Sequence, residues 1–164
     1  MSVDTIDKLF VEELKDLYSA EHQITKALPK MAKASTSGEL RKAFEHHLEE
    51  TRGQIQRLEQ IFSLLDKSPR GKTCAGMKGL LEEGSEMLGE TEEGAVRDAA
   101  MLSAAQRVEH YEMAGYGSVR TYAEILGKTE IAQLLQETLE EEKAADKKLT
   151  EVAKRVNVQA PHAA

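Results

Sequence analysis

The sequence ITKALPKMAKASTSGELRKAFEHHL, at residues 24–48, holds two helical patterns with a break between them. Apolar residues recur every three or four positions before the break and again after it, as on one face of an α-helix. The run Ser35-Thr-Ser-Gly38 interrupts this spacing with residues that punctuate helices. Because the break is short, the two helices are expected to fold back on each other as an antiparallel hairpin.

The helical spacing continues outward from this break in both directions. It predicts one helix from about residue 4 to residue 34 and a second helix through residues 40–65. The apolar positions that carry the two patterns are Ile6, Leu9, Phe10, Leu17, Ile24, Leu28 and Met31, then Leu40, Phe44, Leu48, Ile55, Leu58, Phe62 and Leu65.

The second half of the chain repeats this organisation. Helical spacing extends over about 92–126, stops at Gly127 and resumes through residues 131–156. Between the two hairpins, residues 67–93 keep only a weak pattern, which predicts one short helix. We therefore expect a second tight hairpin, joined to the first by a long crossover.

Two tight hairpins with one long crossover predict an all-α four-helix bundle in which the second and third long helices run parallel. The crossover contributes a short extra helix outside the four long ones. We expect the bundle to occupy residues 1–157 as one domain, and residues 158–164 to form a flexible tail.

Composition agrees with this class and excludes several others. The chain has 164 residues, 40% of them apolar and only 4% aromatic, which suits one helical domain. A net charge of −7 argues against nucleic-acid binding, which needs a basic surface. There is no apolar run of roughly 20 residues and no basic-then-apolar amino terminus, so we expect no membrane span and a cytoplasmic protein. Cys74 is the only cysteine, which excludes an internal disulfide and a cysteine-based zinc site.

Glutamates and one histidine interrupt the apolar stripes of all four expected long helices. These residues are Glu21, His47, Glu50, Glu109, Glu112 and Glu142. Each of them alone has an ordinary explanation, because most helical glutamates are solvated and a single inward histidine is usually a core residue. Their occurrence on every long helix is what calls for a common explanation.

The two hairpins bring these residues to one level of the bundle. Folding back of the first hairpin places Glu21 beside Glu50, and folding back of the second places Glu112 beside Glu142. Three further candidates lie one helical turn from these, on the same side of their helices, and they are His47, Glu109 and Asp146.

A group of inward carboxylates needs a counter-charge. Each ionised and unpaired carboxylate would cost several kcal/mol in the core, and no matching set of inward lysines or arginines is visible. Two divalent cations would supply the missing charge. The candidate metal ligands are Glu21, His47, Glu50, Glu109, Glu112, Glu142 and Asp146.

The same residues stand in four motifs through which the chain resembles the YciE/YciF-like stress proteins of the ferritin superfamily. The motifs are Asp16-Leu-Tyr-Ser-Ala-Glu21, His47-Leu-Glu-Glu-Thr51, Glu109-His-Tyr-Glu112-Met-Ala-Gly-Tyr116 and Glu140-Glu-Glu-Lys143. The resemblance implies a ferritin-like fold, a carboxylate-bridged two-metal centre and a stress-linked role. It also implies that the site is carried by His47 with Glu21, Glu50, Glu109, Glu112 and Glu142.

The ligand pattern departs from that of the wider superfamily. Di-iron bundles carry a Glu on each of two helices and a Glu-x-x-His on each of the other two. Here the second helix has the reverse order, His47-x-x-Glu50, and the fourth offers Ala145 and Asp146 where a histidine would be expected. Such an oxygen-rich site leaves iron, manganese or a mixed pair open as the metal.

Three functions fit this sequence. The protein is a di-metal oxidase of ferroxidase or peroxide-consuming type, or it binds metal without turnover, or it is a helical interaction module whose inward acids bind no metal. In the first case Glu50 and Glu112 would bridge the ions, Glu21 and Glu142 would close the ends, and His47 would hold one ion. Whether the protein is an enzyme is left open by the sequence.

Two further expectations concern packing. The third long helix has a second apolar line, formed by Val108, Tyr111, Tyr122 and Leu126 with Val119 nearby, that must be covered by the crossover helix or by a second copy in a homodimer. In addition, Glu13 and Arg120 are both placed inward at one level of the bundle, about 12 Å from the metal level at ~1.5 Å per residue. We therefore expect them to form a buried ion pair.

Overall fold

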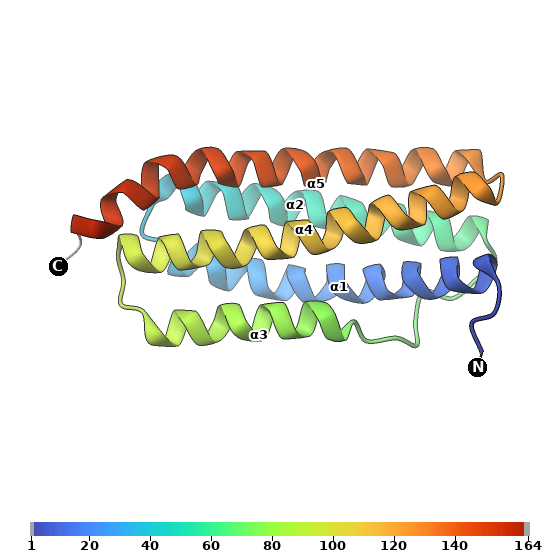
Figure 1. Ribbon diagram of the computed structural model, residues 1–164, viewed down its shortest axis with the longest axis horizontal. Coiled ribbons are helices and arrows are strands. Elements are labelled where there is room, and N and C mark those ends of the chain that lie inside the picture. The colour runs from blue at the N-terminus through green and yellow to red at the C-terminus, as the bar shows by residue number, and fades with distance from the viewer. Residues whose placement is uncertain (1, 163–164) are drawn as a thin grey trace.

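The computed structural model describes residues 2–162 and consists of helices, with no strand in that part of the chain (Figure 1). The elements are α1 (Ile6–Ala34), α2 (Gly38–Leu64), α3 (Ala75–Glu90), α4 (Ala95–Ile125), α5 (Thr129–Val156) and the 3₁₀ helix η1 (Asn157–His162). The expected all-α architecture, with four long helices and one short crossover helix, is confirmed. None of the described helices is long and apolar enough to cross a membrane.

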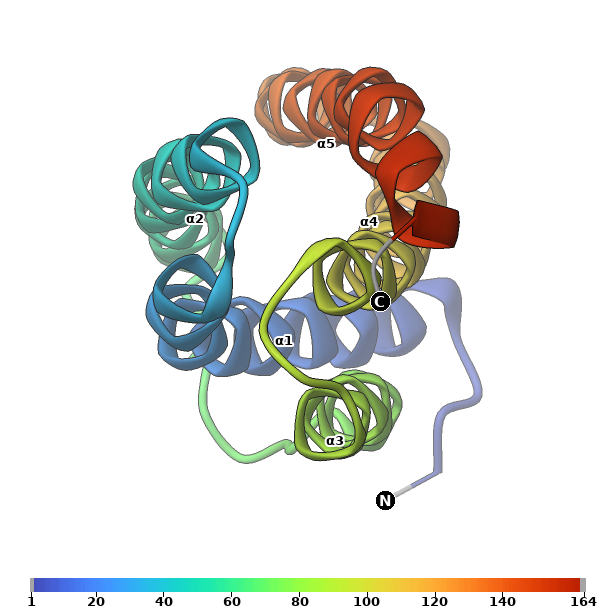
Figure 2. The same ribbon diagram turned by 90° about the vertical axis from the view of Figure 1, so that its left-hand side faces the viewer.

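The four long helices form the bundle, and α3 lies outside it. Helix α1 packs against α2 and α4, and α5 packs against the same two helices. Figure 2 looks along the bundle and shows α3 below α1 and α4, the two helices that it contacts. The fold therefore has a closed ring of four helices with one additional helix on a single side.

Two apolar cores fill the bundle, one towards each end. The first includes Ile24, Leu28, Phe44, Leu102 and Leu149. The second includes Phe10, Leu14, Leu58, Phe62, Tyr116 and Leu135. The buried glutamates and His47 lie between these cores along the sequence of every long helix. Because both cores exclude water, they leave a polar layer in the middle that solvent does not reach easily.

Hydrogen bonds from Asp98 join the two hairpins. This buried residue in the first turn of α4 accepts from the backbone N–H of Thr36 at 2.8 Å and of Ser37 at 2.7 Å. The start of α4 is thus held at the turn between α1 and α2, so α2 and α4 begin at the same end and run parallel. Gly94 precedes α4 at φ 141°, a conformation that favours glycine, and α4 begins at Ala95 rather than near residue 92.

We expect Asp98→Ala to destabilise the protein by about 2–3 kcal/mol, because two buried N–H groups would lose a charged acceptor. Chemical denaturation of the purified variant measures this change. Glu93→Ala, in the connection just before α4, is the matched control, since Glu93 is exposed and should have little effect. Equal stability of the Asp98 variant and the wild type would show that the turn does not need this clamp.

The crossover is anchored where α3 begins. The backbone N–H of Cys74 donates to Ser19 Oγ at 2.9 Å, and the Cys74 thiol donates to Asp16 Oδ2 at 3.0 Å. Tyr111 of α4 donates to the same Asp16 oxygen at 2.6 Å. A Cβ atom at Gly76 would lie 2.6 Å from the Tyr111 ring, so only glycine allows this approach. These contacts tie the crossover to α1 and α4 together.

The crossover helix covers part of the second apolar line of α4. Val108 and Tyr111 pack in one apolar group with Leu80, Leu81 and Leu88 of α3. The other members of that line, Val119, Tyr122 and Leu126, belong to the second core. The crossover helix therefore covers the Val108 and Tyr111 part of this apolar line, while the homodimer stays a prediction.

The expected ion pair between Glu13 and Arg120 was wrong. Arg120 Nη1 lies 3.0 Å from Glu124 Oε1 on the next turn of its own helix, and its side chain is 31% exposed. Glu13 is only half-buried, and no ion pair between the two occurs in the described residues. A long arginine side chain at the edge of an apolar stripe can extend to the surface and pair there with a residue one turn along its own helix. The height of a residue along the bundle does not reveal this direction.

The chain continues beyond α5 as η1, which contacts α4 and α5. Of the tail expected at residues 158–164, the last two residues lie outside the described part of the chain. The division into a bundle and a flexible tail stays a prediction.

Candidate metal centre

Every long helix contributes a buried ionisable side chain to the polar layer. Glu21 comes from α1, His47 from α2, Glu109 and Glu112 from α4, and Glu142 from α5. Glu21, Glu112 and Glu142 are 0% exposed, and Glu109 and His47 are 2% and 7% exposed. Side chains of this type are seldom fully buried unless they are paired or bind a metal.

Four of these residues bring ligand atoms close together. One ligand atom each from His47, Glu109, Glu112 and Glu142 lies within 4.8 Å of all the others. His47 Nε2 is 3.0 Å from Glu109 Oε1, although the two groups are not aligned as a hydrogen bond. We call these four residues the metal cluster.

The carboxylate oxygens of the polar layer lack hydrogen-bond donors. Both oxygens of Glu112 and of Glu142, and one oxygen each of Glu21 and Glu109, are buried without a partner among the described residues. Buried polar atoms are almost always hydrogen-bonded, and leaving one unpaired costs free energy. Six unpaired acceptors converging from three helices are the donor set that a hard or borderline divalent cation requires. The residues present therefore fit a metal.

Glu21 is held at the side of the cluster by a tyrosine. The hydroxyl of the fully buried Tyr116 donates to Glu21 Oε1 at 2.5 Å, and Glu21 Oε2 is left without a partner. Hydrogen bonds of this kind orient a carboxylate before a metal binds. Tyr116 therefore fixes the position of Glu21 and leaves one of its oxygens free, and its inclusion in the ligand set stays a prediction.

Burial dominates the electrostatics of the metal-free site. It raises the pKa of Glu21 to about 7. Burial, reinforced by the neighbouring carboxylates, raises the pKa of both Glu112 and Glu142 well above the usual value. Without metal, the site therefore retains protons on carboxyl groups that would be ionised in water.

His47 and Glu109 behave as an ion pair within this group. Burial lowers the pKa of His47, but the negative charge of Glu109 and the contact with Glu50 raise it well above its usual value. Burial likewise opposes ionisation of Glu109, yet the positive charge of the neighbouring protonated His47 lowers its pKa. A divalent cation would compete with these protons for the same nitrogen and oxygen atoms.

Two predicted ligands lie apart from the metal cluster. Glu50 is 24% exposed, and its Oε2 lies 3.4 Å from Nδ1 of His47, on the other side of the imidazole ring from Glu109. Asp146 is 21% exposed and lies 3.3 Å from Nε2 of the exposed His110. The structure brings Glu50 to the edge of the site and Asp146 to the surface, and their inclusion in the ligand set stays a prediction.

A polar network beside the cluster was not predicted from the sequence. Arg57 of α2 donates to Glu141 at 2.9 Å and to Thr138 at 2.6 Å, and Gln54 donates to Glu141 at 3.0 Å. Its signal in the sequence was the polar pair Thr51 and Gln54, which interrupts the apolar stripe of α2 and is fully buried. This network closes the contact between α2 and α5 on one side of the site.

A bundle whose four helices each direct buried carboxylates or an imidazole to one level defines a ferritin-like protein. The chain belongs to the DUF892 family, described as a domain of unknown function, which it matches over residues 5–161.

The similarity to known proteins extends over nearly the whole chain. Protein YciF of Escherichia coli (strain K12) is 50% identical over 154 residues, which cover 93% of each chain. The crystal structure of the E. coli stress protein YciF superposes with a TM-score of 0.92 at 47% identity, over 96% of this chain and 99% of that one. A Rhodopseudomonas palustris protein designated YcfI gives a TM-score of 0.88 at 45% identity, over 92% and 97% of the two chains. The resemblance to YciF-like stress proteins is confirmed.

Proposed function

We propose that this protein binds two divalent metal ions, iron or manganese, in the polar layer of its bundle and uses them in the cytoplasm as a stress-related oxidase. The observation that carries the proposal is the set of six buried carboxylate oxygens without donors beside His47. The similarity to a protein described as a stress protein supports the stress-related role. Iron or manganese in such a site supplies redox chemistry towards O₂ or peroxide.

The residues of the chain have distinct tasks in this proposal. Glu112, a carboxylate at the centre of α4 with two oxygens free of hydrogen bonds, would be shared between the two ions, and Glu109, Glu142 and His47 would be further ligands. Tyr116 keeps Glu21 oriented. Since Glu21, Glu112 and Glu142 retain protons without metal, they also give the site a means of exchanging protons as its charge changes.

Metal content and oxygen consumption test the proposal in sequence. Protein purified without chelator is analysed by plasma mass spectrometry, and we expect about two iron or manganese ions per chain, the number that offsets four carboxylates. The metal-free protein is then loaded with ferrous iron under nitrogen and mixed with oxygenated buffer or with peroxide. We expect consumption of the oxidant beyond that of ferrous iron in buffer alone.

The two alternative functions give different results in this experiment. Bound metal without additional oxidant consumption would leave a metal-binding protein without turnover. A chain that takes up no iron or manganese, even when the metals are offered in excess, would refute the metal site and leave the helical interaction module.

A further inference from the structure

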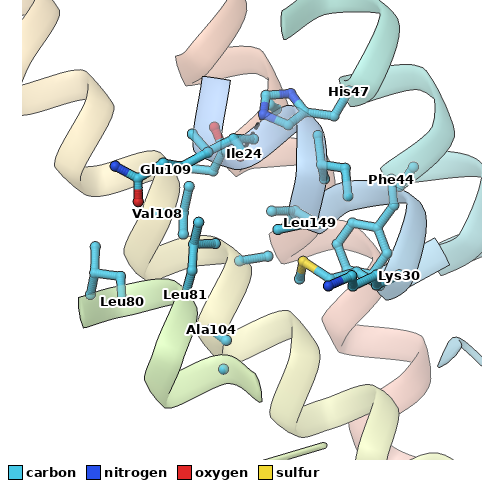
Figure 3. A pocket seen from close by; sticks show the side chains of 18 of the residues that line it. Ile24, Lys30, Phe44, His47, Leu80, Leu81, Ala104, Val108, Glu109 and Leu149 are labelled. Atoms are coloured by element: carbon cyan, nitrogen blue, oxygen red, sulfur yellow. Dashed lines mark ion pairs between the residues drawn. The ribbon is translucent and has the colours of Figure 1, made fainter. Parts of the chain in front are cut away.

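A cavity of about 820 Å³ extends from the metal cluster into the bundle half that α3 covers (Figure 3). All five α-helices line it, and its volume lies within the roughly 300–1,000 Å³ of pockets that hold small organic ligands. Its walls are mainly aliphatic and aromatic side chains, among them Ile24, Leu28, Phe44, Leu81, Val108 and Leu149. A site of this composition suits an apolar chain rather than a polar metabolite.

The cavity exists because small residues face it. Alanines of four different helices, Ala27, Ala43, Ala105 and Ala145, line its wall at positions where larger side chains would fill the space. Larger side chains at these positions would occupy space that the cavity now leaves open. The hollow is therefore a property of the sequence in this half of the bundle, whereas the other half is filled by Phe10, Phe62 and Tyr116.

The two ends of the cavity differ in charge. Figure 3 shows His47 and Glu109 together at one end, and Leu80, Leu81 and Ala104 at the other. Because Glu109 is acidic and Glu50 also lines the cavity, an anionic group is disfavoured at the inner end. An apolar chain end carries no such penalty.

The solvent-exposed edge of the cavity, which we call the rim, is rich in lysine although the protein carries a net negative charge. Five exposed lysines line the cavity, Lys26, Lys30, Lys42, Lys78 and Lys148, in a chain whose net charge is −7. Lys78 and Lys148 have carboxylate partners, Glu82 at 3.6 Å and Glu39 at 3.9 Å. Lys26, Lys30 and Lys42 form no ion pair within residues 2–162. The rim thus offers three unpaired cations beside an apolar interior.

From this combination we infer that the cavity binds an alkyl-chain carboxylate, with its chain in the apolar interior and its carboxylate at the lysine rim. The apolar wall favours a chain through the burial of methylene groups, and the unpaired lysines select an anionic over a cationic head group. The inference does not depend on the metal, because neither the aliphatic wall nor the lysines belong to the metal cluster.

Dodecanoate is a suitable probe, used below its micelle concentration with the metal-free full-length protein in isothermal titration calorimetry. We expect one dodecanoate per chain and a negative heat-capacity change, which is the mark of apolar burial. Dodecyltrimethylammonium, with the same chain and the opposite charge, should bind at least tenfold more weakly if the lysine rim selects the head group. Equal binding of the two probes, or no binding of dodecanoate, would overturn the inference.

Matched variants locate the site. The double change Lys30→Glu with Lys42→Glu places acids on the rim and should weaken dodecanoate binding by roughly tenfold or more. The control is Lys33→Glu with Lys147→Glu, two exposed lysines on α1 and α5 that do not line the cavity, and it should leave the affinity unchanged. A similar loss in both double variants would show general charge attraction instead of this site.

The cavity wall is tested by Ala105→Leu, which fills space one turn from Glu109. Retained helicity by circular dichroism identifies a folded variant, and dodecanoate binding should then be lost or weakened by roughly tenfold, as expected when a pocket is filled. Unchanged affinity in a folded Ala105→Leu protein would place the ligand elsewhere. Glu112 does not line the cavity, so the Glu112→Gln variant should retain dodecanoate binding whether or not it still binds metal. Failure of this inference is thereby distinguishable from failure of the metal proposal.

Discussion

Replacing Glu112 by glutamine is expected to remove one of the two metal ions and at the same time to raise the melting temperature of the metal-free protein. Glu112 is fully buried, and both of its oxygens lack donors. Glutamine keeps the shape of the side chain but is a poor bridging ligand and carries no charge. The variant should therefore lose the function of the site and remove the free-energy cost of keeping a buried carboxyl protonated.

The gain in stability follows from the raised pKa of Glu112. Near neutral pH the folded metal-free chain must keep this carboxyl protonated, whereas the unfolded chain releases the proton, and this difference costs stability. Glutamine has no proton to retain. If removing this cost increases the free energy of unfolding by about 2 kcal/mol, the melting temperature rises by about 4–8 °C for a domain of this size.

Plasma mass spectrometry and differential scanning calorimetry measure the two effects on the same samples. Glu140→Gln is the matched control, because Glu140 is an exposed glutamate of α5 that pairs with Lys143. It should bind as much metal as the wild type and melt at the same temperature. Two ions per chain in the Glu112 variant would remove this residue from the ligand set.

Removing the metal from the wild-type protein should lower its melting temperature by about 10 °C. A ligand that binds only the folded state at about 1,000 times its dissociation constant contributes about 4 kcal/mol, and each kcal/mol shifts the transition by about 2–4 °C in a domain of this size. The measurement compares a chelated sample with one reconstituted with iron or manganese. Identical melting curves would count against a metal site.

The pH dependence of the two samples should have opposite signs. In the metal-free protein, burial raises the pKa of Glu21 to about 7 and places those of Glu112 and Glu142 well above their usual range. Stability from such groups is fully present below the pKa of about 4.3 of an unfolded glutamate, and it is lost as the pH rises through the folded-state pKa. The metal-free chain should therefore melt at a higher temperature at about pH 5 than at about pH 8.

Metal binding reverses this trend, because the metal replaces the retained protons. The difference between the reconstituted and chelated samples should grow from about pH 5 to about pH 8 as fewer protons compete for the ligands. A metal-free protein whose melting temperature does not fall between these pH values would show that the buried carboxyl groups are ionised or solvated in the absence of metal.

The sequence was sufficient for the fold because each long helix carries an apolar stripe at helical spacing and each hairpin has a short break. It was also sufficient to predict that Glu112 and Glu142 lie together, since both interrupt those stripes at positions that the hairpin brings to one level. The periodicity could not separate these residues from Asp146. That residue lies one turn along α5 and only slightly further round it, and it meets His110 at the surface.

Contacts between distant parts of the chain were beyond sequence reasoning. Asp98 reads as an acidic residue in the first turn of a helix, but in the structure it serves the turn of the other hairpin. Arg57 likewise appears as one of many charged residues of α2, whereas its guanidinium is largely buried against Glu141. The cavity was invisible for a related reason, because it depends on how alanines of several helices face one another.

The Asp98 clamp bears on the order in which the chain folds. Each hairpin is built from contacts between neighbouring segments, and such local contacts form early because they close short loops. The bonds from Asp98 to Thr36 and Ser37 span 62 and 61 residues, so they require the whole crossover to be closed. The topology therefore favours assembly of two preformed hairpins, with docking of their ends as the slow step. Weakening the Asp98 hydrogen bonds would slow refolding only if these bonds are already formed in the transition state of folding.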